Sequence, residues 1–295
     1  MSTDVSAIAR TSVWRRKSFR TAVAKVIAYA LAATGAVVVM FPIVWSLSTA
    51  FKELADILAY PPKIFPDPFI WDNVVYAFTK TSLGISMINT TIIGVLSIVG
   101  QALSGSITAY GFARLRFPGR DTIFVGVLAT MMIPFAVVMV PQFVLFRHLG
   151  WIDTWRPLIV PTFLGGSAFY IFLLRQFFLT IPHELDDSAR IDGCSTFGIY
   201  WRIIMPMAVP ALATVAIYTF RAQWLNLLGP LIYINTEEKW TVSLLLSSLT
   251  SAYITGVAFN VIMACSLISI IPLVLIFFAF QRMFIQGIVI TGVKG

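Results

Sequence analysis

The sequence predicts an all-α integral membrane protein with six transmembrane helices and a short cytoplasmic helix on the membrane surface between the fourth and fifth. Three observations predict this fold: 58% of the residues are hydrophobic and only 12% are charged, several long runs carry no charge, and Lys and Arg are distributed unevenly along the chain. An average soluble domain has about 25% charged residues. The mean hydropathy of +0.87 therefore indicates a chain that faces lipid.

A helix needs about 20 apolar residues to cross the hydrocarbon core of a bilayer. The runs 26–51 and 81–113 contain no charged residue. The same criterion along the chain predicts spans over residues 27–48, 85–110, 122–143, 157–176, 205–228 and 257–280. Most of these spans contain proline, which indicates helices that bend around a cavity, since the freed backbone groups must be satisfied by protein or water. We expect an extramembrane loop at 52–80, which can hold a short helix, and a plain loop at 229–246.

The distribution of Lys and Arg predicts the orientation. Six spans place both termini on one side, together with the 114–120 loop and the segment between the fourth and fifth spans. That side holds fourteen Lys and Arg residues and the opposite side holds six, so the positive-inside rule places the fourteen in the cytoplasm. The net charge of +8 is then explained by topology, and no aromatic-rich basic cluster points to nucleic acid. The basic tail, residues 1–25, is expected to lie beside anionic lipid of the bilayer.

Residues 181–204 form a polar island between two apolar segments, and we call this island the elbow. Its first part is predicted to be a short helix, because acidic residues favour the positive end of a helix dipole. Those acids are Glu184, Asp186 and Asp187. Asp192 and Gly193 are expected to end the helix, since glycine tolerates the left-handed conformation of a sharp turn.

The second part of the elbow is predicted to be another short helix. Ser195 or Thr196 can cap it, and Pro206 can begin the following span at its first turn. Ser188, Ala189 and Gly193 give the elbow a small face that another protein could approach closely. From these residues alone, an ordinary interfacial loop is an equally good interpretation.

Several functional classes lack their signatures. Apart from Arg221, no Asp, Glu, Lys or His lies deep in a predicted span, whereas ion-driven carriers usually place such groups there. The chain has no HExxH, no GxSxG and no GxxxxGK[ST] motif, so we expect no catalytic residue, no metal site and no ATP hydrolysis of that type.

Uncharged polar residues are frequent in the predicted spans. They predict a hydrated path for a polyhydroxylated solute, although hydrogen bonding between helices is the alternative for any one of them. The candidate path residues are Asn89, Gln101, Gln142, Arg221, Asn226 and Asn260. Arg221 has three open interpretations: it lines the path, pairs with backbone carbonyls, or pairs with a partner chain.

The run from Asp187 to Gly193, followed after nine residues by Ile203-Ile204-Met205-Pro206, resembles the EAA motif of ABC importer permease subunits. Asp187 stands for Glu, Ser188 for Ala and Met205 for Leu, which keeps the acidic, small and apolar character. The stretches 224–231 and 280–287 resemble the carbohydrate, maltose-permease-like branch of these permeases. The resemblance covers residues 26–295.

This resemblance implies the partners and the mechanism. A second homologous permease subunit completes the pathway, and two ABC ATPase subunits, which bind ATP and Mg²⁺, each receive one elbow and drive import. This chain itself binds no cofactor. An extracytoplasmic solute-binding protein delivers a sugar or related polyol. The expected location is the inner or plasma membrane of a prokaryotic cell.

The residues expected to dock the ATPase are Glu184, Asp187, Ser188, Ala189, Asp192, Gly193, Ile203 and Pro206. Those expected to contact the binding protein are Asn235, Glu237, Glu238 and Trp240. The competing hypotheses are a secondary transporter or channel that works without ATPases, and a membrane enzyme. The elbow motif and the lack of acids within the predicted spans argue against the first.

Overall fold

The computed structural model describes residues 5–252 and 258–292, and the regular structure in these ranges is entirely helical. Four helical segments are long and apolar enough to cross a membrane: Phe19–Ala50, Leu83–Arg114, Arg156–Thr180 and Phe259–Phe280. Two further segments pass the same test only as bent pairs of helices, which brings the number to six if each pair is one span. The predicted all-α membrane fold is confirmed.

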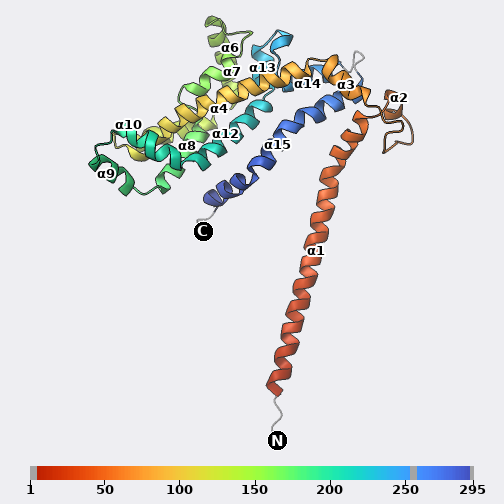
Figure 1. Cartoon of the computed structure of the whole chain (residues 1–295), viewed down its shortest axis with the longest axis horizontal. Helices are drawn as coiled ribbons and strands as arrows, with labels where there is room; N and C mark the ends of the chain where they lie inside the picture. Colours follow the sequence, from red (N-terminus) through yellow and green to blue (C-terminus); the bar gives the residue numbers. More distant parts are fainter. Residues whose placement is uncertain (1–4, 253–257, 293–295) are drawn as a thin grey trace.

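The helices follow in this order: α1 (Val5–Ala50), α2 (Leu54–Ile57), α3 (Asp72–Thr79), α4 (Leu83–Arg114), α5 (Arg120–Ala129), η1 (Thr130–Met132), α6 (Phe135–His148), α7 (Arg156–Ile159), η2 (Val160–Phe163), α8 (Ala168–Thr180), α9 (Glu184–Ile191), α10 (Thr196–Ile199), η3 (Tyr200–Ile204), α11 (Met205–Met207), α12 (Val209–Trp224), α13 (Leu228–Tyr233), η4 (Glu237–Lys239), α14 (Val242–Ala252) and α15 (Phe259–Gly292). Figure 1 shows α9 and α10 at one end of the long axis and α2 and α3 at the other.

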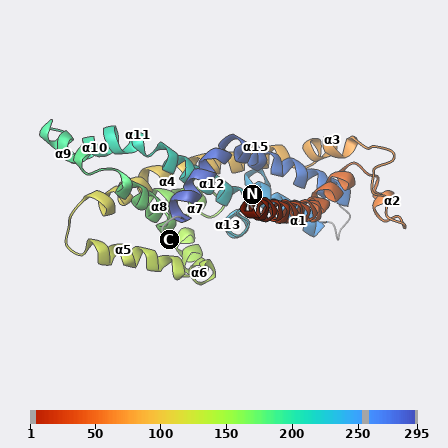
Figure 2. The same ribbon diagram turned by 90° about the horizontal axis from the view of Figure 1, so that it is seen from below.

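Helix α1 projects from the remaining helices in Figure 1 and is seen almost end-on in Figure 2. It begins at Val5, so residues 5–25 of the basic segment are helical and continuous with the first span. The most apolar window within Phe19–Ala50 has none of its residues buried, and the contacts of α1 with the chain are mainly with α15. An apolar helix of this length, exposed within its own chain, requires lipid or another protein to cover it.

Helix α4 is the centre of the bundle and packs against α8, α12 and η2. Small residues permit these close contacts. A Cβ atom added to Gly100 would lie 2.6 Å from the Phe163 ring, and one added to Gly166 would lie 3.0 Å from the Cα of Gly105. Gly166 also has a φ of +77°, which L side chains rarely adopt. The fourth span is therefore interrupted between η2 and α8 at a point where it touches α4.

Replacing Gly100 by valine is expected to destabilise the protein, because the new side chain would force η2 away from α4. Overpacking of this kind costs about 1–3 kcal/mol. The Gly111→Val variant is the matched control, since it lies on the same helix and a Cβ there meets nothing within 4 Å. The thermal midpoint in detergent should fall by several degrees more for Gly100→Val than for Gly111→Val. Equal midpoints would contradict this packing account.

The third and fifth spans are broken rather than straight. The third bends by 96° between η1 and α6, and the fifth by 76° between α11 and α12. Ile133 precedes Pro134 and has an extended backbone, as residues before proline prefer. Ala208 forms the second break, between Pro206 and Pro210. The expectation of a plain loop at 229–246 was wrong, because most of α13, η4 and the start of α14 lie there.

Candidate functional site: an elbow anchored on helix α4

The first helix of the elbow, α9, ends in a tight left-handed turn. Gly193 has a φ of +81°. Its backbone N–H donates to the Arg190 carbonyl at 3.0 Å, and the Cys194 N–H donates to the Ala189 carbonyl at 2.8 Å. This pair of bonds is the Schellman arrangement, which satisfies the last carbonyls of a helix and favours glycine at the left-handed position. The glycine turn expected from the sequence is present.

The second part of the elbow starts with a side-chain cap. The Ser195 hydroxyl accepts a hydrogen bond from the Gly198 N–H at 3.1 Å, which satisfies one free donor at the start of α10. The chain continues through a π-helical turn, η3, into α11. Pro206 cannot donate to a preceding carbonyl, and its ring crowds the one four residues earlier. The wider π turn just before it accommodates this proline.

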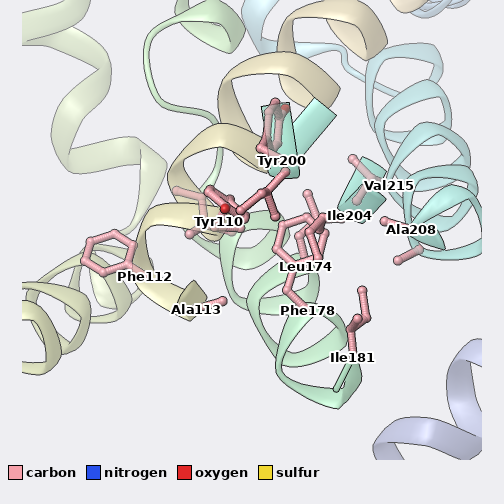
Figure 3. Packing of buried hydrophobic residues seen from close by; sticks show 14 of the residues in the cluster. Tyr110, Phe112, Ala113, Leu174, Phe178, Ile181, Tyr200, Ile204, Ala208 and Val215 are labelled. Atoms are coloured by element: carbon pink, nitrogen blue, oxygen red, sulfur yellow. The ribbon is translucent and has the colours of Figure 1, made fainter. Parts of the chain in front are cut away.

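The inner face of the elbow packs into an apolar cluster (Figure 3). Ile199, Tyr200 and Ile204 are fully buried against α4 and α8, where they meet Leu174 and Phe178. Ala189 of α9 is also buried, at 6% exposure. Ala189, expected to dock an ATPase, is therefore an inward-facing residue that holds α9 against the bundle. Ile203 is half-buried and also packs against the cluster.

Helix α4 holds the elbow at three points spaced four residues apart. The Ser106 and Tyr200 hydroxyls lie 2.7 Å apart, and the Tyr110 hydroxyl donates to the Thr196 carbonyl at 3.3 Å. Arg114 Nη2 donates to the Ile181 carbonyl at 2.7 Å. Residues four apart share one face of a helix, so one face of α4 contacts η3, α10 and the start of the elbow.

Arg114 also forms a buried ion pair with α9. Its Nη1 lies 3.6 Å from Asp186 Oδ2, and the two side chains are 0% and 2% exposed. The same nitrogen lies 3.0 Å from His183 Nδ1. A guanidinium only donates, so Nδ1 is the acceptor. This anchor was not predicted from the sequence, where Arg114 counts only as a topology charge and Asp186 only as an acid at the helix dipole. The two residues are about 70 positions apart, so no local pattern pairs them.

The outer face of the elbow is mostly polar but also carries exposed apolar side chains. Of the residues expected to dock the ATPase, Glu184, Asp187, Ser188, Asp192, Gly193 and Pro206 are exposed. Arg190 pairs with Asp187 at 3.3 Å on this surface. Ile191 is 87% exposed, and Leu185, Phe197 and Trp201 are also exposed. Phe197 and Trp201 stack with their ring centroids 6.5 Å apart.

At the opposite end of α4, the loop 234–241 is held in place by Asp153. Its Oδ1 accepts hydrogen bonds from the backbone N–H groups of Asn235 and Thr236 at 3.0 and 2.9 Å. Its Oδ2 accepts bonds from the Thr236 hydroxyl and from Lys239 Nζ, both at 2.6 Å. Of the expected binding-protein contacts, Asn235, Glu237 and Glu238 are exposed and Trp240 is half-buried.

The Lys239 ammonium and the Thr236 groups hold the pKa of Asp153 well below its usual range. The stability that this carboxylate contributes is therefore present above its unfolded pKa of about 3.9 and is lost only as pH falls through the lowered folded value. Limited proteolysis of the loop 234–241 should be unchanged from pH 8 to pH 4. A sharp rise in cleavage between pH 5 and pH 4 would contradict this, and Asp153→Asn should cleave faster throughout.

The candidate path residues do not all lie together in the structure. The side chains of Asn89 and Asn260 are buried and hydrogen-bond to backbone carbonyls. Asn89 donates to the Glu238 and Trp240 carbonyls, and Asn260 donates to the Lys52 carbonyl. In this chain both amides therefore hydrogen-bond to backbone, and their place in a translocation path stays a prediction. Gln101 is 3% exposed, and its Nε2 has no hydrogen-bond partner among the described residues.

Gln142 and Asn226 come together in one pocket of about 480 Å³. This volume lies within the usual range of small-molecule sites. Its walls are apolar or aromatic and include Phe135, Phe146 and Tyr233. Arg221 is exposed on α12 and belongs to neither this pocket nor an ion pair among the described residues.

The fold and the elbow define a class: a multi-span membrane protein that carries an anchored pair of short helices at one end of its bundle. The chain belongs to the family of binding-protein-dependent transport system inner membrane components, whose model matches residues 101–290. It is a permease subunit of an ABC importer, and this family is a membrane component without ATPase activity of its own. The elbow therefore belongs to a transport protein, and the ATPase-independent alternative is not favoured.

Known proteins resemble the chain over most of its length. It is 36% identical to the arabinooligosaccharides transport system permease protein AraQ of Bacillus subtilis, covering 87% of this chain and 91% of that protein. It is 30% identical to the diacetylchitobiose uptake system permease protein NgcG of Streptomyces coelicolor, covering 87% and 84%. A chain of a bacterial ABC transporter involved in the import of the acidic polysaccharide alginate shares the fold, with a TM-score of 0.78 at 22% identity, covering 88% and 96%.

Proposed function

We propose that this chain forms half of the translocation pathway for a sugar or related polyhydroxylated solute, and that a second, homologous permease subunit forms the other half. The names of the relatives AraQ and NgcG support a carbohydrate substrate. The apolar surface of α1 is exposed within this chain and is open to a second permease as well as to lipid. The pocket that holds Gln142 and Asn226 supplies amide groups beside aromatic rings, a combination suited to a sugar.

The elbow is the docking site for an ABC ATPase subunit, and each of two such subunits receives one elbow. The observation that carries this proposal is its two-sided construction: the inner face is anchored on α4, and the outer face presents Leu185, Ile191, Phe197 and Trp201. A short element fixed on one side and docked on the other transmits rigid-body motion. ATP and Mg²⁺ belong to the ATPase subunits, and this chain needs no cofactor of its own.

In this assignment the chain is a multi-pass protein of the prokaryotic inner or plasma membrane, with the elbow and both termini in the cytoplasm. The positive-inside rule supports the orientation. The loop 234–241 then lies on the outer side, where Asn235, Glu237 and Glu238 are exposed to a solute-binding protein. Because Asp153 fixes this loop, the binding protein meets a preformed surface.

The direct test is purification of the tagged chain from its native membrane in mild detergent. We expect it to retain a second permease and an ABC ATPase. Supplied with sugar-loaded binding protein on the opposite side, the purified complex should import labelled sugar into liposomes only when ATP and Mg²⁺ are present on the elbow side. Uptake by the chain alone, without ATP, would overturn the proposal in favour of a secondary transporter or channel.

A further inference from the structure

Helix α4 has structural anchors at both of its ends. Arg114 at its C-terminal end holds the elbow, whereas Asn89 and Thr90 near its N-terminal end hold the loop 234–241 and the start of α14. Asn89 Nδ2 donates to the Glu238 and Trp240 carbonyls at 2.8 and 3.0 Å. Thr90 Oγ1 accepts a bond from the Val242 N–H at 2.9 Å. The two sets of contacts are 25 residues apart, or about 38 Å along the helix axis.

Stability alone does not explain the buried ion pair at the elbow end of α4. Removing two charges from water is costly, and apolar residues of similar size often stabilise a core equally well. Here Arg114 Nε and Asp186 Oδ1 have no hydrogen-bond partner in the described part of the chain, so the pair is incompletely satisfied. The pair does supply directional contacts. Arg114 contacts Ile181, His183 and Asp186 at once and so fixes the orientation of α9, which apolar contacts cannot do.

We propose that α4 is a transmission rod between the elbow and the outer loop, and that Arg114 and Asp186 are the positioning residues that fix the rod to α9. The inference rests on the proposed function, because it assigns the two connected surfaces to an ATPase and a solute-binding protein. Movement of α9 is transferred to α4 through the ion pair and reaches the outer loop through Asn89. Helices α8 and α12 pack along α4 and move with it.

The experiment uses the complete reconstituted complex and compares ATP hydrolysis with and without sugar-loaded binding protein. The single variants Arg114→Gln and Asp186→Asn each leave an unpaired buried group. The double variant Arg114→Met/Asp186→Leu removes both charges and preserves apolar packing. Asn89→Leu removes the hydrogen bonds from the other end of α4 to the Glu238 and Trp240 carbonyls. Arg116→Gln is the matched control, since Arg116 is exposed and lies two residues beyond the ion pair.

We expect the double variant and Asn89→Leu to retain the ATPase subunits. In both, the stimulation of ATP hydrolysis by sugar-loaded binding protein should fall at least tenfold. Arg116→Gln should behave as wild type. ATPase stimulation and uptake at wild-type level in the double variant would overturn the proposal that the ion pair transmits movement to α4. That result would show a purely structural pair, which apolar residues can replace. A wild-type complex without any ATPase subunit would instead reject the proposed function, so the two failures are distinguishable.

Discussion

Replacing Gly193 by proline is expected to abolish ATP-dependent uptake while the chain still inserts into the membrane. Proline fixes φ near −65°, whereas Gly193 has a φ of +81°, and proline also removes the N–H that donates to Arg190. The turn between α9 and α10 cannot form with these restrictions, so the outer face of the elbow loses its shape. Uptake into vesicles and co-purification of the ATPase subunit measure the effect, and both should fall below a tenth of wild type.

A matched control exists at the other end of the bundle. Gly150 ends α6 with the same pair of backbone bonds, from its own N–H to Arg147 and from the Trp151 N–H to Phe146, and has a φ of +67°. Gly150→Pro should lower thermal stability by a similar amount but should leave the ATPase subunit attached. If both prolines released the ATPase subunit equally, the effect at Gly193 would reflect general unfolding rather than loss of the docking surface.

Replacing Asp153 by alanine is expected to remove the response of the transporter to its binding protein. The carboxylate accepts four hydrogen bonds, two from backbone N–H groups of the loop 234–241, one from the Thr236 hydroxyl and one from Lys239. Without it these four donors lose the one acceptor that ties the loop to the rest of the chain. The loop would no longer present Asn235, Glu237 and Glu238 in one fixed arrangement. The measurement is ATPase stimulation by sugar-loaded binding protein, expected to fall about tenfold or more.

The control for this prediction is Asp56→Ala, which removes an ion pair with Lys63 on another loop at 2.6 Å. That pair is partly exposed and far from the loop 234–241 in the sequence, so stimulation should stay within about twofold of wild type. Normal stimulation in Asp153→Ala would show that binding-protein recognition does not need this loop to be fixed.

The sequence predicted the fold because lipid imposes a simple rule: charge-free runs long enough to cross a bilayer must be helical. It predicted that proline bends the spans, but not that the bends fall at Ile133 and Ala208 or that they reach 96° and 76°. It also missed α13 and α14. Val242–Ala252 has 11 residues, too short for the length criterion, and is helical because it packs on α4 and α15.

The elbow was predictable in its turns but not in its anchoring. The glycine and serine positions were readable because left-handed backbone and N-terminal caps have strong local preferences. Burial of Ala189 and pairing of Arg114 with Asp186 depend on residues about 70 positions away, which local patterns do not reveal. The contacts of Asn89 and Asn260 were unpredictable for the same reason: an amide in a span can bind solute or hydrogen-bond to backbone, and its neighbours decide which.

Contact between the outer face of the elbow and an ATPase subunit underlies the proposed function. It is tested most directly by a chain with Cys194→Ser and Cys265→Ser that carries one new cysteine, either Ile191→Cys on the elbow or Asn235→Cys on the opposite loop. A short bifunctional thiol reagent should cross-link the first to the ATPase subunit and the second to the binding protein. Full sugar uptake without any cross-link from position 191 to the ATPase subunit would contradict the account.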